Sequence, residues 1–259
     1  MPEGDTIRTA ANRVSAALIG REIEAIETPH PRFGKDRWAE KLEGRGVRAV
    51  DVRGKHLMIR FDGGLTVHSH LRMTGSWGVY PRGQRWHRGR HRAWLVIRTA
   101  DSEVVQFDGP VLELMTDGRT RFDPRIAQLG PDVLADEFEE AAFIRRLRED
   151  DQTRTLGDAL LDQRTVAGIG NMWKAEGCWR AEIDPWRRLG DVSDDEALSI
   201  IRAVRPPMFE SVQDGFPKST TLLVYKRAGT PCPRCGEKIR ARGQGDDNRT
   251  TYWCPGCQR

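Results

Sequence analysis

The spacing of apolar residues changes along the chain and predicts helices and strands in turn. Near the amino terminus, apolar residues recur at intervals of three, four and seven positions. They are Ile7, Ala10, Ala11, Val14, Ala17 and Leu18. This spacing predicts an amphipathic helix with one face on a core, and Gly20 stands where such a helix ends.

Between Arg21 and about Met115 the pattern has a period of two, which is typical of strands. The segments concerned are Val47–Val52, Leu57–Phe61, Leu65–Val67, Trp94–Ile97 and Val104–Phe107. Turn residues separate them at 62–64 and 101–102. Because no helical stretch intervenes, we predict antiparallel sheets packed as a sandwich.

Residues 116–131 show no sustained period, and we interpret them as a connection between domains. The pattern then becomes helical, with helices predicted over 138–147, 155–163 and 172–181. Ser193 and Glu196 form a capping box that starts a fourth helix. We expect Pro206 and Pro207 to interrupt that helix, because proline donates no backbone hydrogen bond.

Composition narrows the class of protein. The 259 residues fit about two domains, and 42 basic against 38 acidic residues give a net charge of +4. The positive excess gathers at the carboxyl end, which suits a polyanionic partner or simply a solvated surface. No segment is apolar enough to predict a membrane span. The first residues lack a secretion signal, and four of the five cysteines cluster, so we expect an intracellular protein with a metal site.

Four cysteines near the carboxyl end have the spacing of a metal site. Cys232 and Cys235 form one C-x2-C pair, and Cys254 and Cys257 form another after 18 intervening residues, 236–253. This pattern predicts one Zn²⁺ held by four thiolates, with a structural role because no coordination position stays open for water. A redox role is the alternative, but thioredoxin-like proteins carry a single such pair beside a parallel sheet.

The segment between the two cysteine pairs reads as a hairpin rich in cations. It carries Lys238, Arg240, Arg242 and Arg249. Such a module suits contacts to phosphate, although zinc ribbons also act as purely structural or protein-docking modules. A second cluster of cations, at residues 82–92, fits either a loop that follows phosphates or a solvated hairpin.

The amino terminus has the chemistry of a nucleophile. A small residue after Met1 leaves the initiator removable, so the mature chain would begin with the secondary amine of Pro2. An α-amino group has a pKa near 8, and a helix start lowers it further. A neutral amine attacks an aldehyde carbon to form a Schiff base, and with proline the adduct stays a cationic iminium. Glu3 is then placed to transfer protons. Proline is also common at helix starts for conformational reasons alone.

Five motifs, in order from the first residue to the last, bear a family resemblance. They are MPEG at the start, RGKHL around Lys55, SHLRMTGSW at residues 69–77, LLDQRTVAGIGNMWKAE at residues 160–176, and NRTTYWCPGC in the cysteine segment. Together they make the whole chain resemble the formamidopyrimidine-DNA glycosylase/endonuclease VIII family.

The resemblance implies roles for single residues. It makes Pro2 the nucleophile on the sugar of a damaged nucleotide, Glu3 the general acid and base, and Lys55 a catalytic lysine that contacts phosphate beside the lesion. It also implies DNA contacts. These are His70, Asn171 and Arg249 on the phosphate backbone and Met73 as a wedge in the space left by the flipped nucleotide.

Each of these positions also has a purely structural interpretation. Lys55 is then an exposed residue of a turn, Asn171 an N-cap, and Met73 part of the core. Their joint occurrence favours the functional interpretation.

The patterns and the resemblance together predict an α+β protein. Its parts are an amino-terminal antiparallel β-sandwich flanked by helices, at 1–115, a connection at 116–131, a helical domain with a helix–two-turns–helix motif at 132–218, and a β-hairpin zinc ribbon at 219–259.

Two departures from the family pattern bear on specificity. Thr6 stands where the family usually has a second acid, and the adjacent Asp5 points elsewhere on a helix. Base release is therefore expected to be weaker than in typical members of the family, unless another group substitutes for the acid. Elimination at a pre-formed abasic site needs less acid catalysis and is expected to survive better. The segment from Thr221 to Tyr225 is shorter than the loop that formamidopyrimidine-type members of the family carry there. Val104–Leu114 also lacks the Arg-x-Phe wedge of those members. Both differences favour the endonuclease VIII branch and oxidised pyrimidines, whereas Met73 favours the formamidopyrimidine branch.

These observations lead to one expected function and two alternatives. The first is a base-excision-repair DNA glycosylase with abasic-site lyase activity, a monomer acting on damaged duplex DNA in the bacterial cytoplasm near the nucleoid. The alternatives are an abasic-site lyase or damage-binding protein with little base excision, and a zinc-ribbon interaction protein without a DNA role.

Overall fold

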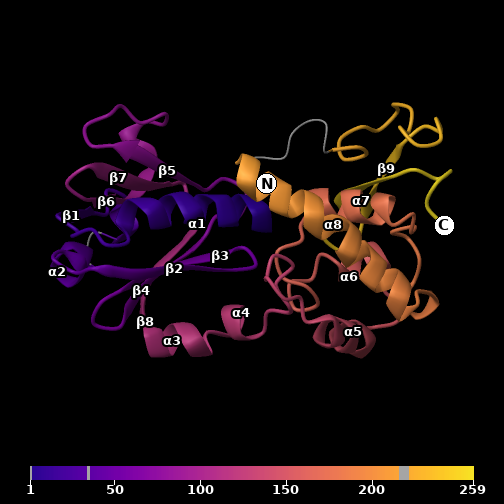
Figure 1. Ribbon diagram of the computed structural model, residues 1–259, viewed down its shortest axis with the longest axis horizontal. Helices are drawn as coiled ribbons and strands as arrows, with labels where there is room; N and C mark the ends of the chain where they lie inside the picture. Colours follow the sequence, from indigo (N-terminus) through magenta and orange to yellow (C-terminus); the bar gives the residue numbers. More distant parts are fainter. Residues whose placement is uncertain (1, 34–35, 216–221) are drawn as a thin grey trace. The chain divides into compact units, whose positions relative to one another are not determined.

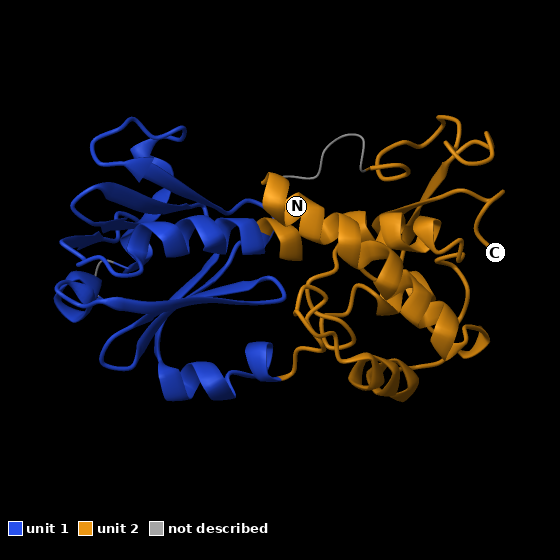
Figure 2. Ribbon diagram, in the orientation of Figure 1, with its two compact units in different colours: residues 1–2, 7–127 blue, residues 3–6, 128–259 orange. Residues whose placement is uncertain are grey.

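The computed structural model describes residues 2–33, 36–215 and 222–259. It divides the chain into two compact units, which Figure 2 colours separately. Unit 1 contains residues 1–2 and 7–127, and unit 2 contains residues 3–6 and 128–259. The first turn of helix α1 (Gly4–Leu18) thus belongs by its contacts to unit 2, and the rest of α1 belongs to unit 1. Met1 and the proposed boundary between residues 218 and 219 lie outside the described residues.

Unit 1 is built from two antiparallel four-stranded sheets and α1 (Figure 1). One sheet has the order β2–β3–β4–β8, with strands Val47–Arg53, His56–Phe61, Leu65–His70 and Val111–Thr116. The other has the order β1–β6–β7–β5, with strands Ala25–Glu27, Ala93–Arg98, Ser102–Phe107 and Ser76–Pro81. The predicted sandwich is confirmed.

The core of unit 1 lies where the two sheets and α1 meet. Ile7, Val14 and Leu18 on α1 are buried with Ile59 of β3 and Leu95 of β6. This is the apolar face that the helical spacing predicted, and the alternation in the strands sends every second side chain into the same core. The turn with Gly63 and Gly64, both at positive φ, joins β3 to β4.

Three short helices of unit 1 escaped the sequence prediction. Helix α2 (Trp38–Leu42) interrupts the strand region, and α3 (Asp117–Phe122) and α4 (Pro124–Ala127) occupy most of the predicted irregular connection. Helices of four to six residues are too short to display a period of 3.6. Strands β1, β5 and β8 were also missed, and β1 has only three residues in which to show a period.

Unit 2 combines helices with a β-hairpin. Its helices are α5 (Glu140–Glu149), α6 (Leu156–Ala159), α7 (Asn171–Arg180) and α8 (Asp194–Asp214). The hairpin consists of β9 (Arg240–Gln244) and β10 (Arg249–Trp253). Single turns of 3-10 helix occur at 31–33, 90–92 and 189–191. The prediction of helix at 155–163 was too long, because α6 ends after one turn. Among the described residues, no helix is both long and apolar enough to cross a membrane.

The expected interruption at Pro206 and Pro207 was wrong, because α8 runs through both residues. Each proline removes one backbone donor from the helix. Packing stabilises the continuous helix nonetheless, since Val204, Pro207 and Met208 are all buried. Gly177 of α7 lies under this helix, where an added Cβ would meet Ile200 at 3.1 Å. The capping box of Ser193 and Glu196 at the start of α8 is confirmed.

Candidate functional site

The Glu3 side chain caps the first turn of α7 from far away in the sequence. Its Oε2 accepts hydrogen bonds from the backbone N–H of Gly170 at 2.9 Å and of Trp173 at 3.2 Å, and its Oε1 accepts one from Met172 at 2.8 Å. A helix start leaves such N–H groups without partners in the helix and favours a negative charge. Glu3 is 1% exposed, so its carboxylate is held in one place by α7.

The glycines before α7 make this contact sterically possible. A Cβ on Gly170 would lie 2.3 Å from Cδ of Glu3. Gly168 has a φ of +102°, and its carbonyl accepts a hydrogen bond of 2.9 Å from the backbone of Gly4. The GIGN motif therefore needs glycine for close approach at Gly170 and for conformation at Gly168.

Asn171 connects α7 to the hairpin. Its Nδ2 donates to the carbonyl of Thr250 at 2.6 Å, next to Arg249 at the start of β10. It is the first residue of α7, and Gly170 is the N-cap. The alternative role of Asn171 as a side-chain N-cap is therefore wrong. Its Oδ1 is buried and accepts no hydrogen bond from residues within the described ranges.

A buried lysine, not foreseen from the sequence, lies one turn further along α7. Lys174 is 0% exposed, and its Nζ donates to Oγ1 of Thr251 at 2.5 Å and to Oε1 of Gln244 at 3.2 Å. Burial lowers its pKa from 10.5 to about 8. Lys174 thereby fixes both strands of the hairpin to α7. The sequence shows only that a charged residue stands between Trp173 and Ala175. The structure shows that both of these neighbours are buried.

Glu176 is a second buried charge on α7 that sequence reasoning missed. Its carboxylate accepts hydrogen bonds from the backbone N–H groups of Leu223, Val224 and Tyr225, with the shortest to each at 2.9 Å. The segment that leads into the cysteine region is therefore also bound to α7.

The four cysteines converge as the spacing predicted. The sulfur atoms of Cys232, Cys235, Cys254 and Cys257 all lie within 4.8 Å of one another, so they are able to hold one metal ion. Trp179 of α7 donates its indole N–H to Sγ of Cys232 at 3.3 Å. The fifth cysteine, Cys178, is fully buried, and burial raises the pKa of its thiol to about 12, as expected for an inert core residue.

The remaining candidates lie in unit 1. Pro2 is half-buried directly before Glu3, and Lys55 lies in the tight turn between β2 and β3, after Gly54 at a φ of +58°. His70 ends β4 and pairs with His56 across the sheet. Met73 follows β4 and is 64% exposed, so its alternative role in the core is wrong.

The acid next to the expected second position is engaged elsewhere. Asp5 is 1% exposed, and its Oδ2 accepts a hydrogen bond of 2.6 Å from Oγ of Ser211 on α8. Thr6 provides only a hydroxyl, 3.5 Å from the same carboxylate. Asp5 therefore acts as a structural contact within unit 2.

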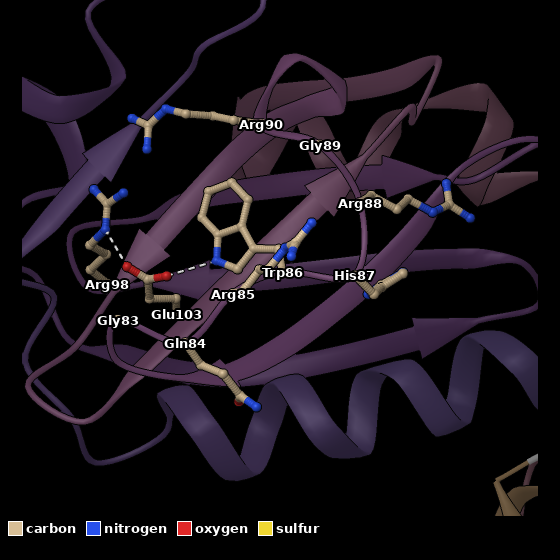
Figure 3. Close-up of a pocket in the computed structure, with 10 residues that line it drawn as sticks. All are labelled: Gly83, Gln84, Arg85, Trp86, His87, Arg88, Gly89, Arg90, Arg98 and Glu103. Atoms are coloured by element: carbon tan, nitrogen blue, oxygen red, sulfur yellow. Dashed lines mark hydrogen bonds and ion pairs between the residues drawn. The ribbon is translucent and has the colours of Figure 1, made fainter.

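The basic segment of residues 82–92 folds back on its own unit. Arg88 binds Asp108 at 2.9 Å, and Arg90 binds Glu27 at 2.5 Å. Figure 3 shows the cavity of about 420 Å³ that this segment lines, where Glu103 accepts hydrogen bonds from Trp86 at 2.7 Å and Arg98 at 2.8 Å. Much of the positive charge is thus neutralised internally, which favours a folded hairpin over a phosphate-following loop.

Comparison with known proteins agrees with this architecture. The chain matches two family models, the formamidopyrimidine-DNA glycosylase N-terminal domain over residues 1–122 and the formamidopyrimidine-DNA glycosylase H2TH domain over residues 129–221. It is similar in fold to the formamidopyrimidine-DNA glycosylase of Lactococcus lactis solved with a damaged DNA, with a TM-score of 0.86 and 24% identity over the full length of both chains.

Curated relatives cover the whole chain. It is 42% identical to "Probable endonuclease 8 2" of Streptomyces coelicolor, over 100% of this chain and 94% of the relative. It is 36% identical to "DNA-(apurinic or apyrimidinic site) lyase Nei2" of Mycolicibacterium smegmatis, over 100% and 99%. The chain belongs to the formamidopyrimidine-DNA glycosylase/endonuclease VIII family, as its motifs indicated.

Proposed function

We propose that this protein is a base-excision-repair DNA glycosylase with abasic-site lyase activity that acts through Pro2. The observation that carries the proposal is the fixed carboxylate of Glu3, immediately after an amine-bearing proline. Three backbone N–H groups of α7 hold this carboxylate, so an acid–base group keeps a constant position beside the nucleophile. The names of the relatives from Streptomyces coelicolor and Mycolicibacterium smegmatis support the same reaction class.

The reaction that we assign to Pro2 proceeds in two stages. Its neutral nitrogen forms a bond to C1′, the C1′–N bond to the base breaks, and the base leaves with that electron pair and takes up a proton from Glu3. The proline nitrogen then gives its own proton to Glu3, its lone pair breaks the C1′–O4′ bond, and O4′ takes up a proton from Glu3. The resulting iminium acidifies the C2′ proton. Loss of that proton to a base and breakage of the C3′–O bond then release the 3′ phosphate. A second elimination through the same conjugated iminium, with loss of the C4′ proton to a base and breakage of the C5′–O bond, releases the 5′ phosphate. Water finally adds to the iminium carbon and frees Pro2.

The other candidates position the DNA in this proposal. Asn171 and Arg249 bind backbone phosphate from unit 2, while Lys55 and His70 bind it from unit 1. Met73 enters the duplex where the nucleotide leaves, which suits its exposed apolar side chain. Because phosphate contacts position DNA without reading sequence, damage recognition depends on how easily the damaged nucleotide leaves the stack. Residues 1–115, 116–131, 132–218 and 219–259 remain our division into catalytic, connecting, helical and ribbon segments.

We further propose that the four cysteines hold one structural Zn²⁺. Four soft sulfur donors fit the tetrahedral preference of this ion and leave no open position. The four sulfur atoms lie within 4.8 Å of one another, so a cation is needed to hold them together as thiolates. The ion supplies folding energy to the hairpin that carries Arg249.

The substrate is proposed to be oxidised pyrimidines in duplex DNA, with the protein acting as a monomer in the bacterial cytoplasm. A second candidate is an abasic-site lyase with little base excision. The hydrogen bond from Ser211 to Asp5 favours this candidate. It occupies the carboxylate adjacent to Thr6, so that carboxylate does not serve as the second acid for base release. The name of the relative from Mycolicibacterium smegmatis points the same way.

Borohydride trapping on three duplexes distinguishes these functions. The duplexes carry an abasic site, an oxidised pyrimidine or an oxidised purine at the same position. A covalent adduct at Pro2, identified by mass spectrometry, is expected with the abasic duplex, and none is expected when the amino terminus is blocked by a retained leader. Trapping by the blocked protein would contradict the role of Pro2. Adduct with the abasic duplex alone would select the second candidate.

A further inference from the structure

Three histidines gather on the outer face of the β2–β3–β4–β8 sheet. His56 on β3 lies directly across from His70 on β4, and His68 on β4 lies opposite Glu113 on β8. Alternate residues of the same strands, such as Ile59, point into the core. His56 and His68 are nevertheless 8% and 0% exposed. A buried polar cluster on the outer face of a sheet has no role in the hydrophobic core.

The cluster is continuous from the turn of Lys55 to helix α4. Nδ1 of His56 lies 2.8 Å from Nε2 of His68, and the ring of His56 meets the ring of His70 edge-on with centroids 4.7 Å apart. Nδ1 of His68 lies 3.7 Å from Oε2 of Glu113. Glu113 accepts two hydrogen bonds from Arg125 of α4, at 3.2 and 2.5 Å.

Hydrogen bonding determines the tautomer of His70. The backbone N–H of Arg72 donates to Nδ1 of His70 at 3.1 Å, so this nitrogen is an acceptor and carries no proton. The proton of the neutral ring therefore lies on Nε2. In the His56–His68 contact one nitrogen must also be an acceptor, and this excludes a doubly charged pair.

Burial and neighbouring charges keep the cluster neutral. Burial lowers the pKa of His56 to about 2 and of His70 to about 4, and it also lowers the pKa of His68. The cations that face the cluster, Lys55, Arg72 and Arg125, act in the same direction, whereas Glu113 and Asp123 oppose it. His70 is therefore a neutral donor at physiological pH.

We propose that His56 and His68 are positioning residues, which hold His70 as an Nε2–H donor and fix the turn of Lys55 for contact with one DNA phosphate. The proposal rests on the proposed function, in which Lys55 and His70 face DNA. Lys55 then supplies the charge of this contact, and His70 supplies a directed hydrogen bond without charge.

The tautomer is measured first, by nitrogen NMR of the protein without DNA. The expected result is an Nε2-protonated His70 that stays neutral down to pH 5. A His70 that is protonated on Nδ1, or that titrates near 6.5 in the natural protein, would overturn the proposal. This measurement does not depend on DNA binding.

Binding to a duplex with a tetrahydrofuran abasic analogue is then measured by fluorescence anisotropy at several salt concentrations. Lys55→Gln is expected to reduce the slope of log affinity against log salt by about one, and His70→Gln to leave the slope unchanged. His56→Leu and His68→Leu are expected to weaken binding about tenfold. The conservative variants His56→Asn and His68→Gln, which keep a polar atom at the contact, are expected to restore most of it.

His91→Leu is the matched control, because His91 is an exposed histidine of the same unit. If His56→Leu and His68→Leu fold and bind like the natural protein, the positioning role is wrong. If they lose affinity and the conservative variants fail to restore it, packing alone explains the loss and the proposal fails. If the natural protein does not bind the analogue, the proposed function fails, while the NMR result still decides the state of His70.

Discussion

Oε2 of Glu3 and the backbone nitrogen of Gly170 are 167 positions apart in the sequence and 2.9 Å apart in the structure. Through this contact α7 holds the proposed acid–base group at the amino terminus in place. The same helix binds the hairpin through Asn171 and Lys174. Helix α7 therefore holds both Glu3, the proposed acid–base group, and the hairpin that carries the proposed phosphate contact Arg249.

Gly170→Ala should impair catalysis without unfolding the protein. Its Cβ would lie 2.3 Å from Cδ of Glu3 and would displace the carboxylate, so the single-turnover rate of strand cleavage at an abasic site should fall at least tenfold. Gly118→Ala is the control, because no atom lies within 4 Å of an added Cβ there. Equal cleavage rates for the two variants would show that the position of Glu3 does not matter.

Ser211→Ala should destabilise the protein. It removes the hydroxyl donor from the buried carboxylate of Asp5, and an unsatisfied buried group costs about 1–3 kcal/mol. Ser199→Ala on the same helix removes only a local bond to the carbonyl of Glu196 and should change stability by less than about 0.5 kcal/mol. Urea unfolding measures both, and indistinguishable midpoints would refute the structural role of Asp5.

Lys174 should make stability rise with pH in the alkaline range. Its folded pKa is about 8, against 10.5 as the ordinary value, so between these values the unfolded chain binds more protons than the folded chain. Because one bound proton changes the free energy of unfolding by about 1.4 kcal/mol per pH unit, stability should rise by about 3 kcal/mol from pH 8 to 10.5. Lys174→Met should lack this rise, whereas the exposed Lys41→Met should keep it. Urea unfolding across this pH range tests the difference, and parallel profiles would contradict it.

Removal of the proposed zinc ion should unfold the cysteine segment and leave the sandwich folded. Trp179 contacts Sγ of Cys232, and the guanidinium of Arg234 lies 4.1 Å from the centre of its ring. A chelator should therefore change tryptophan fluorescence and weaken DNA binding, while the strand signal of unit 1 in circular dichroism persists. Cys232→Ser should reproduce the effect, and Cys178→Ser should not. Loss of the entire strand signal would contradict this independence.

The sequence alone determined those features that have a strong local signal. The helical spacing from Ile7 to Leu18 predicted α1, the alternation in β3 and β7 predicted strands, and the cysteine spacing predicted the cluster. The motifs identified the family and supplied candidate site residues, whose roles stay predictions. Such signals are local because each reports which face of an element is buried, or how far apart two ligands lie in the chain.

Only the tertiary structure decided which partner each polar group meets. Nothing near Glu3 in the sequence shows that α7 binds it, and nothing near Lys174 shows that two strands of a distant hairpin surround it. The continuity of α8 through Pro206 depends on packing against α7, and the neutrality of His56 depends on burial by neighbouring strands and α4. Long-range contacts, burial and the electrostatics that follow from them arise only when the chain is folded, because they depend on groups distant in the sequence.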